Sequence, residues 1–237
     1  MLEAYVTNLG KYNEGILAVE WLKLPANTKE MQELLKRIGV DGRRYEEIFI
    51  TDYHTEIKGL HGCLSEHASI DELNYFASLL EKMDEGEREK FEAALAYGEH
   101  TGSLQDLINL SQNLDCYDFY HGVYDEEELG YYLIEELDAL EIPDHLEQYF
   151  NYKAYGRDVS LNEGGLFTNY HYIAQNGNDF IEHYNGRDMP EEYRIFSCPK
   201  AERPSILETL KQFQDVKKEA PVLSGEKRRP VTAHDER

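Results

Sequence analysis

Apolar and polar positions alternate along the first part of the chain in the manner of half-buried strands. Three segments follow this period of two, namely residues 3–9, 16–24 and 46–53. Between the last two, Asn27 followed by Glu30 is a capping pair, and the apolar positions that come after it recur at helical spacing. The pattern predicts a first module over residues 1–64, an antiparallel sheet with one helix.

Helical spacing replaces alternation after residue 64. Ser69 with Glu72 predicts a capped helix over 70–83, and Ser103 with Asp106 predicts the start of a short one. Another helix is predicted between them, over 85–97. These elements predict a small acidic helical module over residues 65–111.

The remaining chain predicts a mixed module and a tail. In residues 112–195 the pattern favours helices over 125–140 and 143–150, followed by strands within 157–184 and a hairpin turn at Asn176–Gly177. Residues 196–237 are rich in Lys, Arg, Pro and Ser, which predicts a basic, mostly disordered tail with one short helix near 204–217. The predicted fold class is therefore α+β, with three small domains in series and a flexible tail.

Charge changes this picture because it is concentrated in the middle of the chain. The net charge is -23 and the pI is near 4.7. Residues 1–60 contribute -2, residues 61–111 contribute -8, residues 112–195 contribute -15 and residues 196–237 contribute +2. Phosphates are bound by Lys and Arg, so this balance argues against direct binding of nucleic acid and against an anionic membrane surface.

The densest part, which we call the acidic segment, is residues 112–158. Before its first basic residue, Lys153, it holds twelve carboxylates: Asp115, Asp118, Asp125, Glu126, Glu127, Glu128, Glu135, Glu136, Asp138, Glu141, Asp144 and Glu147. Tyrosines and leucines are interleaved with them, so the segment should fold rather than form a solvating tail. One interpretation is a solubilising surface. The other is a surface that attracts a DNA-binding protein, since B-DNA carries one charge per roughly 1.7 Å of axis.

Catalytic and metal motifs are weak by comparison. The sequence has no GxSxG or Walker loop, and a hydrolase site is the less favoured explanation of so many carboxylates. His54, His61, Cys63 and His67 form one metal-like group, but their spacing fits no zinc pattern. We therefore expect a protein that is not an enzyme, with no cofactor and no metal.

The cysteines and the N-terminus bear on location. Cys63, Cys116 and Cys198 are odd in number and widely spaced, which indicates reduced thiols. The first residues have neither the basic nor the apolar part of a signal peptide, and no apolar run approaches the length of a membrane span. These features predict a cytoplasmic protein without a membrane partner.

Three separated stretches resemble the ArdA family of antirestriction proteins from conjugative plasmids and transposons. They are YVTNLGKYNEG…EWLKL (5–24), EEIFITDY (46–53) and LGYYLIEELDALEIPDHLEQYFNYKAYGRDV (129–159), and the likeness extends over about residues 1–175. Residues 129–141 correspond to the family's antirestriction motif. The resemblance implies an elongated, non-enzymatic mimic of B-form DNA, which inhibits type I restriction–modification enzymes by occupying the DNA site of the methyltransferase core.

The resemblance also implies roles for individual residues. It implies a homodimer formed through the C-terminal domain. The twelve carboxylates are the candidate partner-binding residues, and the resemblance makes six of them candidate phosphate mimics: Glu126, Glu127, Glu135, Glu136, Asp138 and Glu141. Five motif residues are candidates for packing or for the dimer contact: Leu129, Tyr131, Tyr132, Leu133 and Leu137. The chain continues past the usual end of the family, with residues 175–193 and then the basic tail. An alternative function is that of an acidic regulatory partner for another DNA-binding protein of a mobile element.

Overall fold

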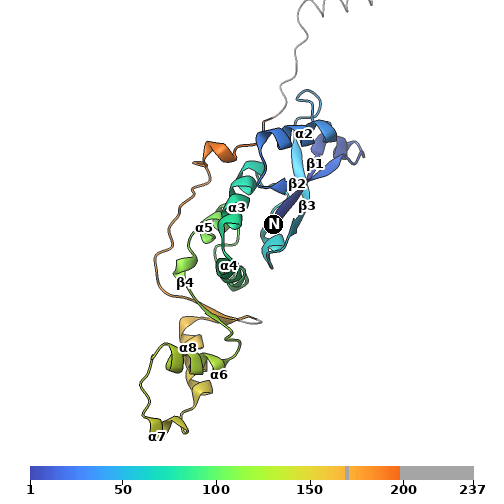
Figure 1. The fold of residues 1–237 in the computed structure, drawn as a ribbon. Coiled ribbons are helices and arrows are strands. Elements are labelled where there is room, and N and C mark those ends of the chain that lie inside the picture. The colour runs from blue at the N-terminus through green and yellow to red at the C-terminus, as the bar shows by residue number, and fades with distance from the viewer. Residues whose placement is uncertain (169–170, 198–237) are drawn as a thin grey trace, which may run out of the picture. The chain divides into compact units, whose positions relative to one another are not determined.

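A three-stranded antiparallel sheet forms the N-terminal part of the computed structural model, which describes residues 1–168 and 171–197. Its strand order is β2-β1-β3 (Figure 1), with β1 at Leu2–Asn8, β2 at Val19–Leu24 and β3 at Ile48–Thr55. The three predicted strands are confirmed. The segment between β1 and β2, predicted as a turn, contains the short helix α1, Leu9–Asn13.

Helix α2, Thr28–Ile38, covers this sheet with its apolar side. The predicted cap is present: the Asn27 side chain accepts from the backbone N–H of Glu30, and the Glu30 carboxylate accepts from the N–H of Asn27. Met31 and Leu35 are fully buried, so the helical spacing in the sequence marks the face that packs.

The predicted helices of the middle part are also confirmed. They are α3 (Ile70–Lys82), α4 (Glu85–Tyr97) and α5 (Leu104–Leu110), preceded by the 3-10 turn η1 (Leu60–Cys63). Ser69 and Ser103 cap α3 and α5 as expected. A single apolar core runs from the N-terminal sheet into these helices, where Phe76 and Phe91 pack with ring centroids 6.2 Å apart.

The third part is a mixture of short helices and a second small sheet, with strand order β4-β6-β5. In chain order its elements are η2 (Leu114–Cys116), β4 (Tyr117–His121), α6 (Glu126–Tyr131), the π-helical turn η3 (Tyr132–Glu136), α7 (Asp144–Glu147), α8 (Tyr152–Glu163), β5 (Leu166–Phe167), β6 (His171–Gln175) and η4 (Glu191–Tyr193). The chain is thus mixed α and β, in agreement with the predicted class. The divisions at residues 64 and 111 stay predictions.

The predicted helix over 125–140 is shorter than expected. The α-helix gives way to the π turn at Tyr132, and Asp138 adopts a left-handed conformation with φ of 49°. The last turn contains acidic residues and no basic ones, an arrangement that the helix dipole disfavours. The carboxylates after Glu136 therefore lie on irregular chain.

The predicted strands within 157–184 are wrong for the most part. Residues 152–163 form helix α8 instead, which begins with the Asn151 side chain capping Ala154 and ends at Gly164 with φ of 66°. Gly177 does adopt positive φ, 81°, but no second hairpin strand follows β6. The strand propensity of Tyr and Val in this segment is outweighed by the helix caps and by packing against α6.

Residues 178–197, which we call the C-terminal strap, run back along α5 and α3 (Figure 1). At the end of the described strap, the backbone N–H groups of Ile195 and Phe196 donate to the Asp71 carboxylate at 2.8 and 2.7 Å. Tyr184 and Ile195 belong to the same apolar core as the N-terminal sheet. Cys198 and the predicted tail helix lie outside the described residues.

Candidate partner-binding surface

The twelve carboxylates of the acidic segment all reach solvent. Asp118, Glu126 and Glu128 are half-buried, and the other nine are exposed. They come from five elements and the loops that join them, beginning at η2 and β4 and continuing through α6, η3 and α7. The fold therefore places the predicted site residues on the surface, where a partner could contact them.

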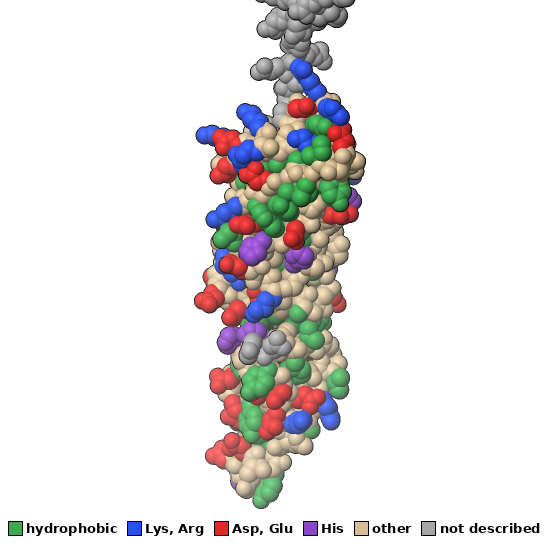
Figure 2. All heavy atoms as spheres, turned by 90° about the vertical axis from the view of Figure 1, so that its right-hand side faces the viewer, with side chains coloured by type: hydrophobic (Ala, Val, Ile, Leu, Met, Phe, Trp, Pro, Cys, Tyr) green, Lys and Arg blue, Asp and Glu red, His purple; other side chains and the backbone are tan. Residues whose placement is uncertain are grey.

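None of the twelve forms an ion pair with a cationic group of the described residues. The N-terminal part is different. There Glu14 pairs with Arg44 and Glu20 pairs with Arg37, each at 2.8 Å. In Figure 2 the blue Lys and Arg side chains are most numerous in the upper part of the face, where Figure 1 places α2 and the N-terminal sheet. Within the described residues, no ion pair compensates the negative charge of these twelve carboxylates.

Three of the carboxylates have roles within the fold. Asp125 caps α6 by accepting from the backbone N–H groups of Glu127 and Glu128, both at 2.9 Å. Glu128 accepts from the backbone N–H of Tyr124 at 3.0 Å, and its interaction with the Tyr124 side chain raises the pKa of that hydroxyl. Glu135 accepts from the Tyr152 hydroxyl at 3.1 Å, and burial together with this bond raises the pKa of Tyr152. These three carboxylates keep charge at the surface while fixing the backbone beneath it.

Carboxylates of this surface affect the pKa of Lys90 on α4. Burial lowers the pKa of the Lys90 ammonium, while Asp118 and Asp115 act in the opposite direction. Neither carboxylate lies within ion-pair distance of it. The field of the acidic segment thus extends to the neighbouring helix without being neutralised there.

The five motif residues separate into two groups. Leu129 and Leu133 are buried in a second apolar core, together with Val123, Tyr172 and Ala174. Tyr132 is half-buried and stacks on Tyr120 with centroids 4.7 Å apart. Tyr131 and Leu137 are 45% and 47% exposed. The fold uses the first group for its own packing, and it leaves Tyr131 and Leu137 available for contact with another chain.

Two glycines let the motif helix cross α8 at very short range. A Cβ on Gly130 would overlap the backbone carbonyl of Tyr152, and a Cβ on Gly156 would overlap the carbonyl of Glu126. The pair α6 and α8 makes the most extensive contact between elements of the described chain. Helices α6 and α8, which both overlap residues 129–159 of the family resemblance, therefore pack against each other through their glycines.

A hollow of about 270 Å³ lies beside the motif. Its lining includes Glu128, Glu135 and Glu136 together with the rings of Tyr131 and Tyr132. Carboxylates beside aromatic faces attract cations, above all the planar guanidinium group of arginine. The lining of the hollow is therefore complementary to a basic side chain.

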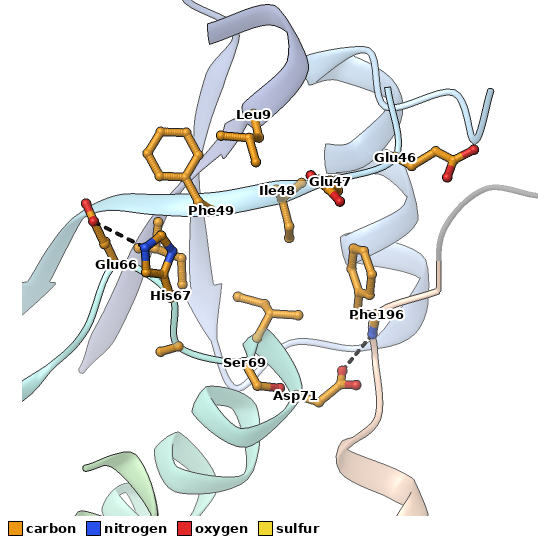
Figure 3. Close-up of a pocket in the computed structure, with 13 residues that line it drawn as sticks. Leu9, Glu46, Glu47, Ile48, Phe49, Glu66, His67, Ser69, Asp71 and Phe196 are labelled. Atoms are coloured by element: carbon orange, nitrogen blue, oxygen red, sulfur yellow. Dashed lines mark hydrogen bonds and ion pairs between the residues drawn. The ribbon is translucent and has the colours of Figure 1, made fainter. Parts of the chain in front are cut away.

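The four residues of the metal-like group noted in the sequence do not form a group of three potential ligands in the part of the chain that the structure describes. His61 pairs with Asp52 at 3.1 Å and His67 with Glu66 at 3.4 Å, but neither joins a group of three ligands. His67 instead lines a hollow of about 360 Å³ beside β3, to which Phe196 also contributes (Figure 3). Within the described residues one other group does come together, Glu89 with His121 and His171. Sequence reasoning missed it because its members are far apart along the chain.

Uncompensated carboxylates with interleaved tyrosines, on a mixed α and β fold, define an acidic binding protein. The family model for ArdA, antirestriction protein, matches residues 4–174. The chain belongs to the ArdA family of antirestriction proteins, which act against restriction–modification enzymes. A comparison with individual curated proteins gave no match. No helix of the described residues has the length and apolar character needed to cross a membrane.

Proposed function

We propose that the acidic segment mimics B-form DNA and occupies the DNA-binding site in the methyltransferase core of a type I restriction–modification enzyme. The observation that carries this proposal is the absence of ion pairs at all twelve carboxylates within the described residues. DNA-binding channels are cationic, so an uncompensated array of carboxylates meets a field of opposite sign there. Such complementarity raises the association rate and excludes DNA from the same channel.

The mechanism is competition, without a chemical step on the protein itself. Each carboxylate that reaches solvent contributes a small, screened interaction, and the total depends on many of them. Nine carboxylates remain when Asp125, Glu128 and Glu135 are set aside for their roles in the fold. These nine are the stronger candidates: Asp115, Asp118, Glu126, Glu127, Glu136, Asp138, Glu141, Asp144 and Glu147. Binding should weaken as salt rises.

The proposal includes a homodimer that acts in the cytoplasm, where incoming DNA meets restriction enzymes. Tyr131 and Leu137 are the motif side chains that a second copy could bury, because Leu129 and Leu133 already pack inside the fold. A dimer would double the number of carboxylates presented to one enzyme. No cofactor or metal enters this activity.

The direct test is a gel-shift competition. A type I methyltransferase is loaded on a labelled recognition duplex and the full-length protein is added at low and at moderate salt. Displacement near one dimer per enzyme, weaker at the higher salt, supports mimicry. No displacement at large excess at either salt contradicts it, and the alternative of an acidic partner for another DNA-binding protein would then take its place.

A matched pair of variants makes this test specific. The first combines Glu136→Gln, Asp138→Asn, Glu141→Gln and Asp144→Asn, four exposed carboxylates without ion pairs. The second neutralises Glu14, Glu20, Glu33 and Glu56, which pair with cationic groups. Both variants change the net charge equally. Only the first variant should lose the ability to displace DNA from the enzyme. Equal losses in both variants would show that the total charge of the protein matters more than the acidic segment.

A further inference from the structure

Three side chains from different parts of the chain converge where helix α4 meets the second sheet. His121 ends β4 and His171 begins β6, and the antiparallel register places these two residues directly opposite each other. Opposed residues of an antiparallel pair share a face of the sheet with Cβ atoms about 4.5–5.5 Å apart. The two imidazole rings accordingly have centroids 4.7 Å apart.

Glu89 of α4 completes the group. Its carboxylate lies 3.2 Å from Nδ1 of His121, and one potential ligand atom from each of the three residues lies within 4.8 Å of the others. Helix α4 packs on β6 over the same region. Two strands and one helix therefore hold the three groups together.

The chemistry of this group is that of a zinc ligand set. Two histidine nitrogens and one glutamate oxygen are ligands that Zn²⁺ accepts at about 2.0–2.2 Å, with a fourth position left for water. Zn²⁺ ligands in tetrahedral geometry lie roughly 3.3 Å apart, so rotation of the exposed His121 ring must bring the atoms closer. A hollow of about 630 Å³, lined by all three residues, gives room for the fourth ligand.

One further pair of charged side chains lines the hollow beside the group. Lys58 and Glu92, which also face the hollow, are paired with each other at 3.5 Å. A surface ion pair between His121 and Glu89 is the simpler interpretation, and it does not use the opposed placement of the two histidines.

We propose that Glu89, His121 and His171 bind one Zn²⁺ ion and thereby tie helix α4 to the sheet of β4 and β6. The site is independent of the proposed competition with DNA. Its effect is on stability, because an ion that binds only the folded chain shifts the unfolding equilibrium towards that state. The ion would hold β4, the strand that precedes α6, against helix α4.

The test is Zn²⁺ titration of the metal-stripped, full-length protein by calorimetry, in about 0.15 M salt, where the Debye length is about 8 Å. We expect one saturable site and a rise in the thermal midpoint on binding. Loss of a supporting partner of a metal ligand typically costs about 10–100-fold in affinity. Loss of a ligand in His121→Ala or His171→Ala should therefore weaken binding by more than roughly a hundredfold.

His61→Ala and His67→Ala are the matched controls, because each of these histidines pairs with a carboxylate but has no second histidine opposite. Both should bind Zn²⁺ like the unchanged protein. Co²⁺ should give the visible absorption of a four-coordinate ion, and His121→Asn should abolish it. Circular dichroism without metal checks folding, and His121 is exposed enough that its replacement should be tolerated.

Two results would overturn the site. One is weak binding at many positions that Ca²⁺ reproduces and that the His121 and His171 variants leave unchanged, which means that cations only accumulate at the acidic surface. The other is an equal loss in the His61 or His67 variant. Either result leaves the proposed competition with DNA untouched, since that activity is measured without added metal.

Discussion

The side-chain amide of Asn109 is hydrogen-bonded to the backbone of Tyr184 in both directions. Its Nδ2 donates to the Tyr184 carbonyl and its Oδ1 accepts from the Tyr184 N–H, each at 2.8 Å. One helical turn later, Asn113 forms the same pair of bonds with Ile181, at 2.8 and 2.9 Å. Helix α5 and the turn that follows it thus offer two amides in place of a neighbouring strand.

This relationship explains how the C-terminal strap stays in place without belonging to a sheet. A buried backbone N–H or C=O needs a partner, and a carboxamide offers one donor and one acceptor in the required arrangement. The Tyr184 hydroxyl also donates to Glu72 of α3 at 2.7 Å. The strap begins after the residues that the family model matches, yet it binds helices inside that match.

Asn109→Ala should destabilise the protein. The change leaves the buried N–H and C=O of Tyr184 without partners, and each such group costs about 1–3 kcal/mol. The free energy of unfolding in urea should fall by roughly 2–4 kcal/mol. Asn162→Ala, at an exposed position of α8, is the control and should change it little. Equal effects of the two variants would mean that the strap does not depend on Asn109.

A second prediction concerns the crossing of α6 and α8. Gly130→Ala and Gly156→Ala place a methyl group against backbone atoms that cannot rotate away, so each should cost roughly 1–3 kcal/mol or more. In Gly86→Ala the new Cβ meets only the Asp84 carboxylate at 3.5 Å. Alanine is the better helix former by about 1 kcal/mol, so this control should be neutral or stabilising. Thermal unfolding of the three variants distinguishes steric overlap from helix propensity.

The sequence predicted the parts of the fold whose signals are local. The N-terminal strands and helices α2 to α5 have caps such as Asn27 and Ser103 beside periodic apolar positions, and they were found close to their predicted bounds. Helix α8 was missed because its stability depends on Gly156 packing against α6, a contact between residues about 26 apart in the chain. The strap was mistaken for a hairpin strand because its partners are side chains of α5.

The candidate surface was predicted in composition but not in detail. Charge counting located the acidic segment, and its carboxylates reach solvent in the fold. The sequence could not reveal that Asp125 and Glu128 fix the start of α6, because capping depends on where the helix begins. It also could not bring Glu89 beside His121, since that contact depends on how α4 meets the second sheet.

A third prediction follows from the buried tyrosines. Burial raises the pKa of Tyr117 to about 12 and also raises that of Tyr172, whose hydroxyl donates to Glu163 at 3.1 Å. In the unfolded chain these phenols ionise near pH 10. The unfolded state therefore loses protons first, so stability should be constant below about pH 10 and fall as the pH rises towards the pKa of the folded state.

The urea midpoint measured between about pH 8 and 11 tests this prediction, with phenolate absorbance followed in parallel. Tyr172→Phe should have a flatter decline at alkaline pH because the unfolded state of the variant has one less group to ionise. Tyr149→Phe is the control, as Tyr149 is 77% exposed. A decline unchanged by Tyr172→Phe would show that other groups cause the alkaline loss.

The last prediction concerns self-association through the antirestriction motif. Leu133→Asp should unfold the second core, since Leu133 is 7% exposed there, so it cannot separate packing from dimer contact. Leu137→Asp can, because that side chain is 47% exposed. If the motif forms the dimer, this variant should keep its circular dichroism and thermal midpoint while its mass by light scattering moves towards that of a monomer.

Leu161→Asp is the matched control for the dimer. Leu161 is 73% exposed on α8, outside the motif, so the same charge is added to another exposed leucine. A carboxylate buried at a dimer contact costs several kcal/mol, whereas one at a free surface costs little. The two variants should therefore differ in mass at equal concentration. An unaltered dimer in Leu137→Asp would exclude this side chain from the contact, and dissociation in both variants would mean that added charge alone separates the chains.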